Sequence, residues 1–263
     1  MKIPRAMLSS VRRLGLLTRR ALREAAHQRI LWLLAAGAVL LTLGGGRLRE
    51  LNFGAAEARF LTDFATGTRM LCGSLLAIAL PAALFFPALE SRTIQLELMH
   101  GARRMEWLLG RLAATWTLLG GFTALVTITL FLLLNRSGMA ISSLGWLAGD
   151  AVLAYVRLAV IAAAAFAFCA IARSPLLAQG LAVLLVLAGQ LTPVWASGQP
   201  VRQNLVEQLA GWVGGLVPNL QLFEQAGDIA SSPATLAGIF LYGAGYCLLY
   251  GGVACVVFSR REL

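Results

Sequence analysis

The sequence predicts an all-α polytopic membrane protein with six transmembrane helices. Hydrophobic residues make up 59% of the 263 positions and charged residues only 13%, whereas about a quarter of the residues of a soluble protein are charged. Apolar stretches of the roughly 20 residues that cross a bilayer recur along the chain. They are continuous rather than alternating, and what lies between them is too short for a soluble domain of ordinary size.

The segment before the first apolar stretch, residues 1–29, has the pattern of an amphipathic helix. In "LSSVRRLGLLTRRALREAAHQR" the small and apolar residues share one helical face, and most arginines lie elsewhere around the helix. This predicts a helix in the cytoplasmic lipid interface with its arginines toward anionic headgroups, so membrane lipid is an expected partner. A disordered, positively charged tail is the alternative.

Basic residues orient the six predicted spans, which are residues 30–46, 70–89, 107–134, 144–172, 175–196 and 234–258. One side of this arrangement holds 15 Lys and Arg residues and the other holds six. Because basic residues concentrate on the cytoplasmic side, both termini are expected there, in the inner (plasma) membrane of a bacterium. The positive-inside distribution explains the net charge of +10, so no nucleic-acid partner is expected.

Between the fifth and sixth predicted spans, residues 197–233 carry apolar residues at intervals, broken by glycines and a proline. We expect short extracytoplasmic helices there, which lie at the outer interface or dip into it. Backbone that dips into a bilayer must be hydrogen-bonded or buried in protein.

On the cytoplasmic side, "ESRTIQLELMHGARRMEWLLGRL", residues 90–112, carries charges of both signs between the second and third spans. Apolar residues recur at helical spacing on both sides of a break at His100 and Gly101. This predicts a short amphipathic helix whose charges would fix the register of a soluble partner while its apolar residues supply contact area. An ordinary cytoplasmic loop, basic only because of its side, is the alternative.

The same segment resembles the cytoplasmic loop of the permease subunits of type 2 ABC exporters, where a pattern close to E-x-R/K-T-I-x-x-L-L-x-x-P-x-x-R-x-E-x-L/I-L-G-K follows the second span. The matching positions are Glu90, Arg92, Thr93, Ile94, Arg104, Glu106, Leu109 and Gly110. Gly101 stands where the family usually has proline, and Arg111 replaces the usual lysine. The C-terminal "FSRREL" and the outer "LVPNLQLFE", residues 216–224, also resemble segments of this family.

The resemblance implies an exporter built as a homodimer, or as a pair with a related permease, bound to cytoplasmic ABC ATPase subunits. The implied division is an interfacial helix at 1–29, a transmembrane domain at 30–258 with a coupling loop at 90–106 and an extracytoplasmic loop at 197–233, and a cytoplasmic tail at 259–263. The implied ATPase-coupling residues are Glu90, Arg92, Thr93, Arg103, Arg104, Glu106 and Arg111.

ATP and Mg are expected in the partner ATPase, and no cofactor is expected on this chain. A P-loop needs a lysine within G-x-x-x-x-G-K-S/T, and the only lysine is Lys2. The chain is therefore expected to be a transport subunit without catalytic residues.

Two charged residues, Asp150 and Arg157, fall within the fourth predicted span. They are seven residues apart, about two helical turns, so they share a face with a rise of roughly 10 Å. Helical side chains lean toward the N-terminus, which directs Arg157 toward Asp150. Two hypotheses stay open: these residues line the translocation path, where Arg157 meets an anionic substrate group, or they form a structural ion pair.

Two other classes of membrane protein fit the sequence less well. An intramembrane enzyme needs a nucleophile with a histidine, or a carboxylate-rich metal site, at membrane depth. Neither His27 nor His100 lies in a predicted span, and the four cysteines fall in apolar runs without a close pair, so no metal site is expected. An ATP-independent secondary transporter or channel is the alternative function, although such proteins usually show internal repeats, and none is evident in this sequence.

Overall fold

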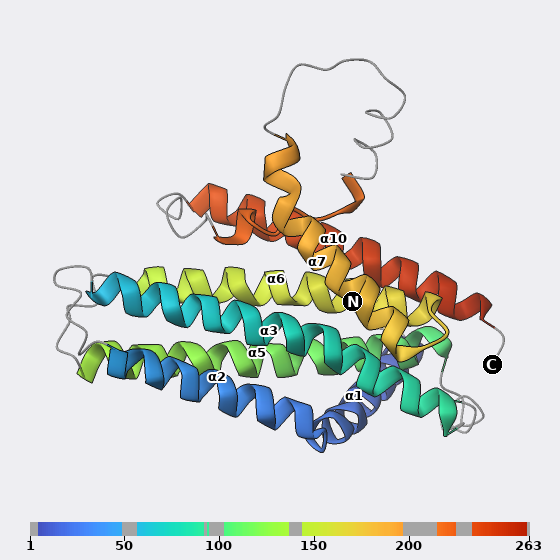
Figure 1. Cartoon of the computed structure of the whole chain (residues 1–263). Helices are drawn as coiled ribbons and strands as arrows, with labels where there is room; N and C mark the ends of the chain where they lie inside the picture. The colour runs from blue at the N-terminus through green and yellow to red at the C-terminus, as the bar shows by residue number, and fades with distance from the viewer. Residues whose placement is uncertain are drawn as a thin grey trace, which may run out of the picture.

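The computed structural model describes residues 5–48, 57–91, 94, 103–136, 144–196, 215–224 and 233–261, and these ranges are helical without any strand (Figure 1). The long helices are α1 (Arg5–Ala26), α2 (Arg29–Leu48), α3 (Glu57–Glu90), α5 (Arg104–Arg136), α6 (Leu144–Ile171), α7 (Pro175–Ala196) and α10 (Pro233–Arg260). The predicted all-α class is therefore confirmed.

Five of the described helices, α2, α3, α5, α6 and α10, are long and apolar enough to cross a membrane. Helix α7 is also apolar and has 22 residues. Each predicted span thus coincides with a helix, but α3 begins at Glu57, well before the predicted start at residue 70. A drop in hydropathy ends an apolar run without ending a helix, because helical hydrogen bonds lie in the backbone.

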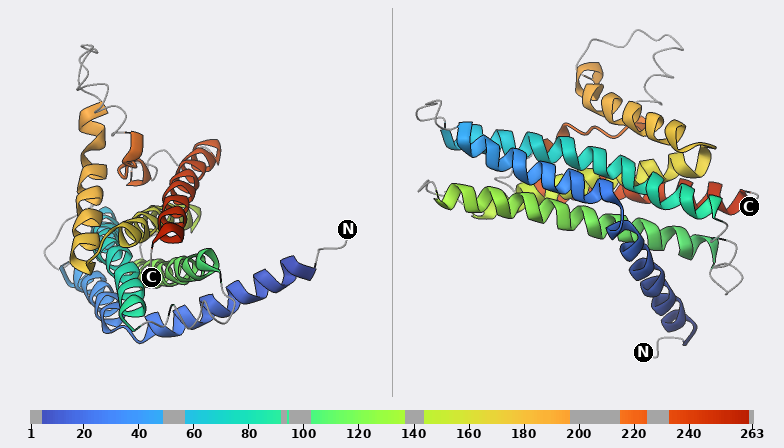
Figure 2. Two further views of the ribbon diagram at one scale, coloured as in Figure 1. Left: turned by 90° about the vertical axis from the view of Figure 1, so that its right-hand side faces the viewer. Right: turned by 60° about the horizontal axis from the view of Figure 1, so that its bottom comes forward.

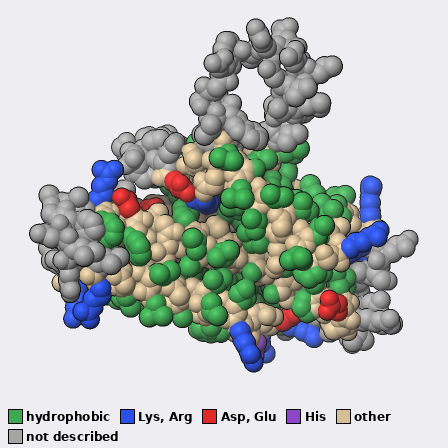
Figure 3. Space-filling model, in the orientation of Figure 1, with side chains coloured by type: hydrophobic (Ala, Val, Ile, Leu, Met, Phe, Trp, Pro, Cys, Tyr) green, Lys and Arg blue, Asp and Glu red, His purple; other side chains and the backbone are tan. Residues whose placement is uncertain are grey.

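The exposed side chains of the described residues are largely apolar along the middle of the molecule. Figure 3 shows hydrophobic groups over this region, with most Lys and Arg side chains toward the two ends of the long axis. Large exposed examples are Trp32, Leu33, Leu40, Leu71, Leu184, Leu241 and Leu248. A soluble monomer rarely exposes so much contiguous apolar surface, whereas a bilayer covers it.

Helix α6 lies at the centre of the described helices, and it packs against α3, α5, α7 and α10. Of its apolar stretch 83% is buried, compared with 22% for α2. The sequence explains this position, because "IAAAAFAFCA", residues 161–170, consists largely of small side chains that let neighbouring helices approach closely.

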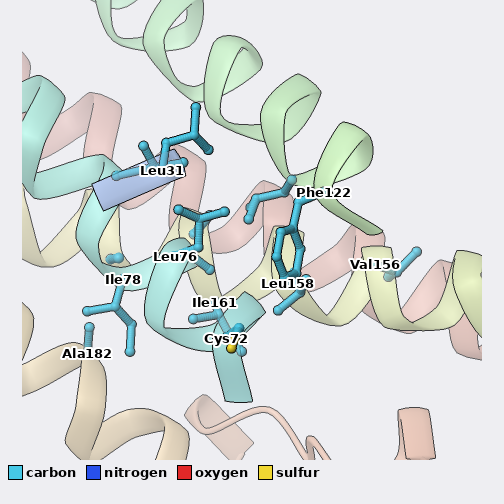
Figure 4. Packing of buried hydrophobic residues seen from close by; sticks show 14 of the residues in the cluster. Leu31, Cys72, Leu76, Ile78, Phe122, Val156, Leu158, Ile161 and Ala182 are labelled. Atoms are coloured by element: carbon cyan, nitrogen blue, oxygen red, sulfur yellow. The ribbon is translucent and has the colours of Figure 1, made fainter. Parts of the chain in front are cut away.

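Two apolar clusters fill the space around α6. In the first, Leu76 of α3, Phe122 of α5 and Leu158 of α6 pack together (Figure 4). The second lies where α3 ends and α5 begins, and its rings are close: Trp107 is 5.9 Å from Phe85 and 5.3 Å from Phe258, between centroids. The second cluster joins α3, α5, α6 and α10 at one end of the bundle.

The C-terminal part of helix α1 packs against the first turns of α5, and its N-terminal part extends away from the bundle (Figure 2). The close approach requires a glycine, because a Cβ at Gly110 would lie 3.0 Å from the Cβ of Leu17. The predicted helix is present, and Ala21 and Ala25 on its predicted apolar face are buried. The C-terminal part of that face therefore covers protein, and the predicted contact of the helix with lipid stays a prediction.

Replacing Gly110 with leucine is expected to separate α1 from α5 and to lower the free energy of unfolding by about 1–3 kcal/mol, because the new side chain overpacks the contact. Gly121→Leu is the matched control: it lies on the same helix, and a Cβ there would meet nothing within 4 Å. Thermal unfolding of the purified variants in detergent measures the difference. Equal melting shifts for the two variants would contradict this account of the α1–α5 contact.

Candidate functional site

Three charged side chains are buried within the described ranges, and all three are arginines: Arg69 on α3, Arg111 on α5 and Arg157 on α6. A buried charge is costly unless it is paired and hydrogen-bonded. Each of these arginines forms a salt bridge with a carboxylate from a different element of the fold. The pair of Arg157 with Glu224 is the centre of the candidate site.

Arg157 lies halfway along α6 and forms an ion pair with Glu224. One Nη of the guanidinium also lies 3.1 Å from the sulfur of Met70, while its Nε has no hydrogen-bond partner. The two partners differ in burial, since the Arg157 side chain is 2% exposed and the Glu224 side chain 40%. The amide of Gln190 on α7 reaches the same carboxylate at 3.5 Å.

Glu224 belongs to residues 215–224, which we call the inserted segment because Pro218, Leu220 and Phe223 are buried against the helices. Leu220 and Phe223 are 0% and 1% exposed. The Leu220 N–H donates to the Gly189 carbonyl on α7 at 3.1 Å, and a Cβ at Gly189 would lie 2.7 Å from the Pro218 oxygen. The glycine thus lets backbone approach backbone. The expected position of this region at the outer interface stays a prediction.

Three tyrosines of α10, spaced four residues apart, bond to the backbone of the inserted segment. The hydroxyl of Tyr242 accepts from the Asn219 N–H at 2.9 Å. Tyr246 donates to the Gly215 carbonyl at 2.8 Å, and Tyr250 to the Leu216 carbonyl at 2.6 Å. These are three of the four tyrosines of the whole chain, so this residue type is concentrated on the face of α10 that contacts the inserted segment.

This tyrosine stripe shows how deeply the segment is inserted. Tyr250 is ten residues before Arg260, the last residue of α10, which corresponds to about 15 Å along a helix. The inserted segment therefore reaches a level well inside the length of α10. Its polar backbone groups at this depth are satisfied by α7 and α10 rather than by solvent.

The expected contact between Asp150 and Arg157 is replaced by two pairs with other elements. Asp150 accepts from Arg69 of α3, which also reaches Thr127 of α5 at 3.3 Å. Arg157 pairs with Glu224 instead. The spacing argument placed both charges on one face of α6 correctly, but it contained no information on neighbouring elements. Whether they line a translocation path stays a prediction.

The predicted coupling residues differ in where they lie and in what they contact. Arg92 and Thr93, with 95–102, lie outside the described residues. Glu90 and Arg103 are exposed at the end of α3 and just before α5, and the Glu106 carboxylate accepts from the Arg103 N–H at 3.3 Å. Arg104 donates to carbonyls at the end of α10.

Arg111 differs from the other predicted coupling residues because its guanidinium is buried. It forms an ion pair with Glu24 of α1 at 3.1 Å, donates to the Leu84 carbonyl of α3, and lies 4.4 Å from the ring centroid of Trp107. Its contacts therefore join α1, α3 and α5 within the chain.

Sequence analysis missed Arg69, Glu224 and the tyrosine stripe as parts of a site. The four-residue spacing of the tyrosines in an otherwise apolar span was the available signal, because residues i, i+4 and i+8 share a helix face. Over the described ranges, His, Cys, Asp and Glu form no group that could hold a metal ion.

Comparison of the chain with protein-family models gave no match, and comparison with curated proteins gave none either.

Glu224→Gln is expected to lower the free energy of unfolding by about 3 kcal/mol, because it leaves the buried guanidinium of Arg157 without a counter-charge. Adding Arg157→Leu removes the orphaned charge, so the double variant should be more stable than Glu224→Gln alone. Denaturant unfolding of the purified variants measures both effects, with the exposed carboxylate variant Glu90→Gln as the control. A double variant as unstable as the sum of the two single variants would refute a direct coupling.

Proposed function

We propose that the chain is the permease subunit of an ABC exporter, with six transmembrane helices and both termini in the cytoplasm of a bacterial inner membrane. The observation that carries the proposal is the resemblance of residues 90–112, which bridge α3 and α5, to the ATPase-coupling loop of type 2 exporters. Five apolar helices of sufficient length support the membrane part. Helix α7 would be the remaining span, since 22 residues extend about 33 Å.

The end of the bundle where α3 ends and α5 begins is the proposed ATPase-binding end. Exposed charges of both signs, Glu90 and Arg103, lie there, and such charges give a protein partner its orientation. The same end carries the contact of α1 with α5. The buried Arg111 would contribute indirectly, by holding α1 beside α5.

In this proposal the inserted segment and Arg157 form the element that changes state during transport. A ligand shifts a conformational equilibrium only through different contacts with the two states. The segment has one charged contact, Glu224 with Arg157, and a set of backbone hydrogen bonds with α7 and α10. Movement of α6 or α10 relative to α7 would strain both the ion pair and these backbone hydrogen bonds. ATP and Mg would act in the partner, and a second permease would complete the path.

The proposed topology predicts opposite labelling of two engineered cysteines in a chain without its native ones. Arg59→Cys, near the start of α3, should react with a membrane-impermeant maleimide on intact cells. Ser91→Cys, just beyond the end of α3, should react only after the membrane is permeabilised. Both native side chains are exposed, so accessibility within the protein is matched, and labelling of Ser91→Cys on intact cells would overturn the orientation.

The proposed partner predicts that an ABC ATPase with a P-loop co-purifies with the tagged chain and gives the complex ATP hydrolysis. Reversing both charges, Glu90→Arg with Arg103→Glu, should abolish this co-purification. The matched control, Arg59→Asp with Asp63→Arg, reverses an exposed pair near the start of α3 and should leave the complex intact. Transport by the purified chain without any ATPase would instead support the secondary transporter or channel.

A further inference from the structure

Helices α6 and α10 both end beside the start of α5, where their last carbonyls need donors. The last four carbonyls of an α-helix have no partner within the helix. Cations also bind favourably at this end because of the helix dipole. Two arginines supply the donors here, and each comes from a different element than the helix it binds.

Arg104, the first residue of α5, donates to the end of α10. Its Nη1 lies 3.0 Å from the carbonyl oxygen of Ser259 and 2.8 Å from that of Arg261. The first turn of α5 is therefore tied to the last turn of α10, although 155 residues separate Arg104 from Ser259 in sequence.

Arg261, directly after α10, donates to the end of α6. Its Nη1 lies 3.2 Å from the carbonyl oxygen of Cys169 and 3.1 Å from that of Ala170. Its guanidinium carbon also lies 5.9 Å from the ring centroid of Phe85 on α3. We call Arg104, Arg261 and these four carbonyls the tail brace.

We infer that the tail brace transmits movement of the start of α5 to α6 and α10, and so to the inserted segment. This inference rests on the proposed function, in which an ATPase contacts the loop that leads into α5. Helix α6 carries Arg157, and α10 carries the tyrosine stripe. Near the start of α5, Trp107 also packs on Phe258 of α10, but this contact is between rings and lacks the direction of a hydrogen bond.

Charge alone does not explain the two arginines. Arg260 lies between Ser259 and Arg261, carries the same charge and is exposed, so it satisfies the orientation rule equally well. Arg261 is half-buried and directed at the carbonyls of another helix. The planar guanidinium suits a bond to two carbonyls at once, and it brings to the helix C-terminus a positive charge that a neutral amide or hydroxyl lacks.

The test uses the full chain with its ATPase in lipid nanodiscs, and compares Arg261→Gln and Arg261→Lys with the control Arg260→Gln. Hydrogen exchange of peptides covering residues 215–224 is measured without nucleotide and with ATP plus orthovanadate, together with ATP hydrolysis. Arg261→Gln should keep the ATPase bound and hydrolysing but lose the nucleotide-dependent change in exchange. Arg260→Gln should keep the nucleotide-dependent change in exchange, and Arg261→Lys should retain part of it.

A second measurement needs no ATPase. In the chain alone, Arg261→Gln should speed exchange at the last turn of α6 about fivefold, as expected for the loss of one net hydrogen bond, and Arg260→Gln should not. If no ATPase co-purifies with the unaltered chain, the proposed function falls and the inference falls with it. If the ATPase binds and Arg261→Gln responds to nucleotide like Arg260→Gln, only the inference is overturned.

Discussion

The pairing of buried arginines with carboxylates from other elements constrains the whole structure. A guanidinium cannot be discharged in a protein, so it must take a counter-charge with it when it is buried. Arg69 meets Asp150, Arg157 meets Glu224, and Arg111 meets Glu24. These three contacts fix α3 against α6, the inserted segment against α6, and α1 against α5.

The two peripheral elements depend most on these pairs. Helix α1 mainly contacts α5, and among its described side chains Ala21 and Ala25 are buried. The inserted segment buries Pro218, Leu220 and Phe223. Apolar area of this size stabilises modestly, so the charge pairs and backbone hydrogen bonds decide where these elements lie.

Hydropathy was sufficient to predict the helices, because each apolar run of the sequence is a helix in the structure. Hydropathy did not predict where α3 begins, because the first turns of this helix include the charged residues Arg59, Asp63 and Arg69. Sequence analysis counted Arg69 among the outer residues beyond the membrane, yet it is 1% exposed within the bundle. A charge at such a position lowers mean hydropathy, while a carboxylate on a neighbouring helix makes its burial possible.

The partners of the buried charges could not be predicted from spacing. Asp150 and Arg157 share a face of α6, but their partners lie 81 and 67 residues away in sequence. Contacts within one helix are set by its period, whereas contacts between helices depend on packing that a single sequence does not specify. The tyrosine stripe was predictable as a shared face, and only its target, the inserted segment, required the structure.

The same reasoning separates the residues of the exporter-like motif by role. Gly110 admits the backbone of α1, and Arg111 pairs with α1 and α3. The contacts of these two residues thus lie inside the chain, whereas Glu90 and Arg103 are the exposed charges among the described coupling residues.

Energetics sets a limit on how such coupling could work. Removing one partner of a buried ion pair costs about 3–5 kcal/mol, and reversing a two-state equilibrium from 1:99 to 99:1 takes about 5.5 kcal/mol of differential binding. The Glu224 side chain is 40% exposed, so its contact with Arg157 is worth less than a fully buried pair, and less than the differential binding that reverses such an equilibrium. Because α6 is the most buried helix and carries Arg157 at its middle, a displacement applied at its end reaches this contact without an intervening loop.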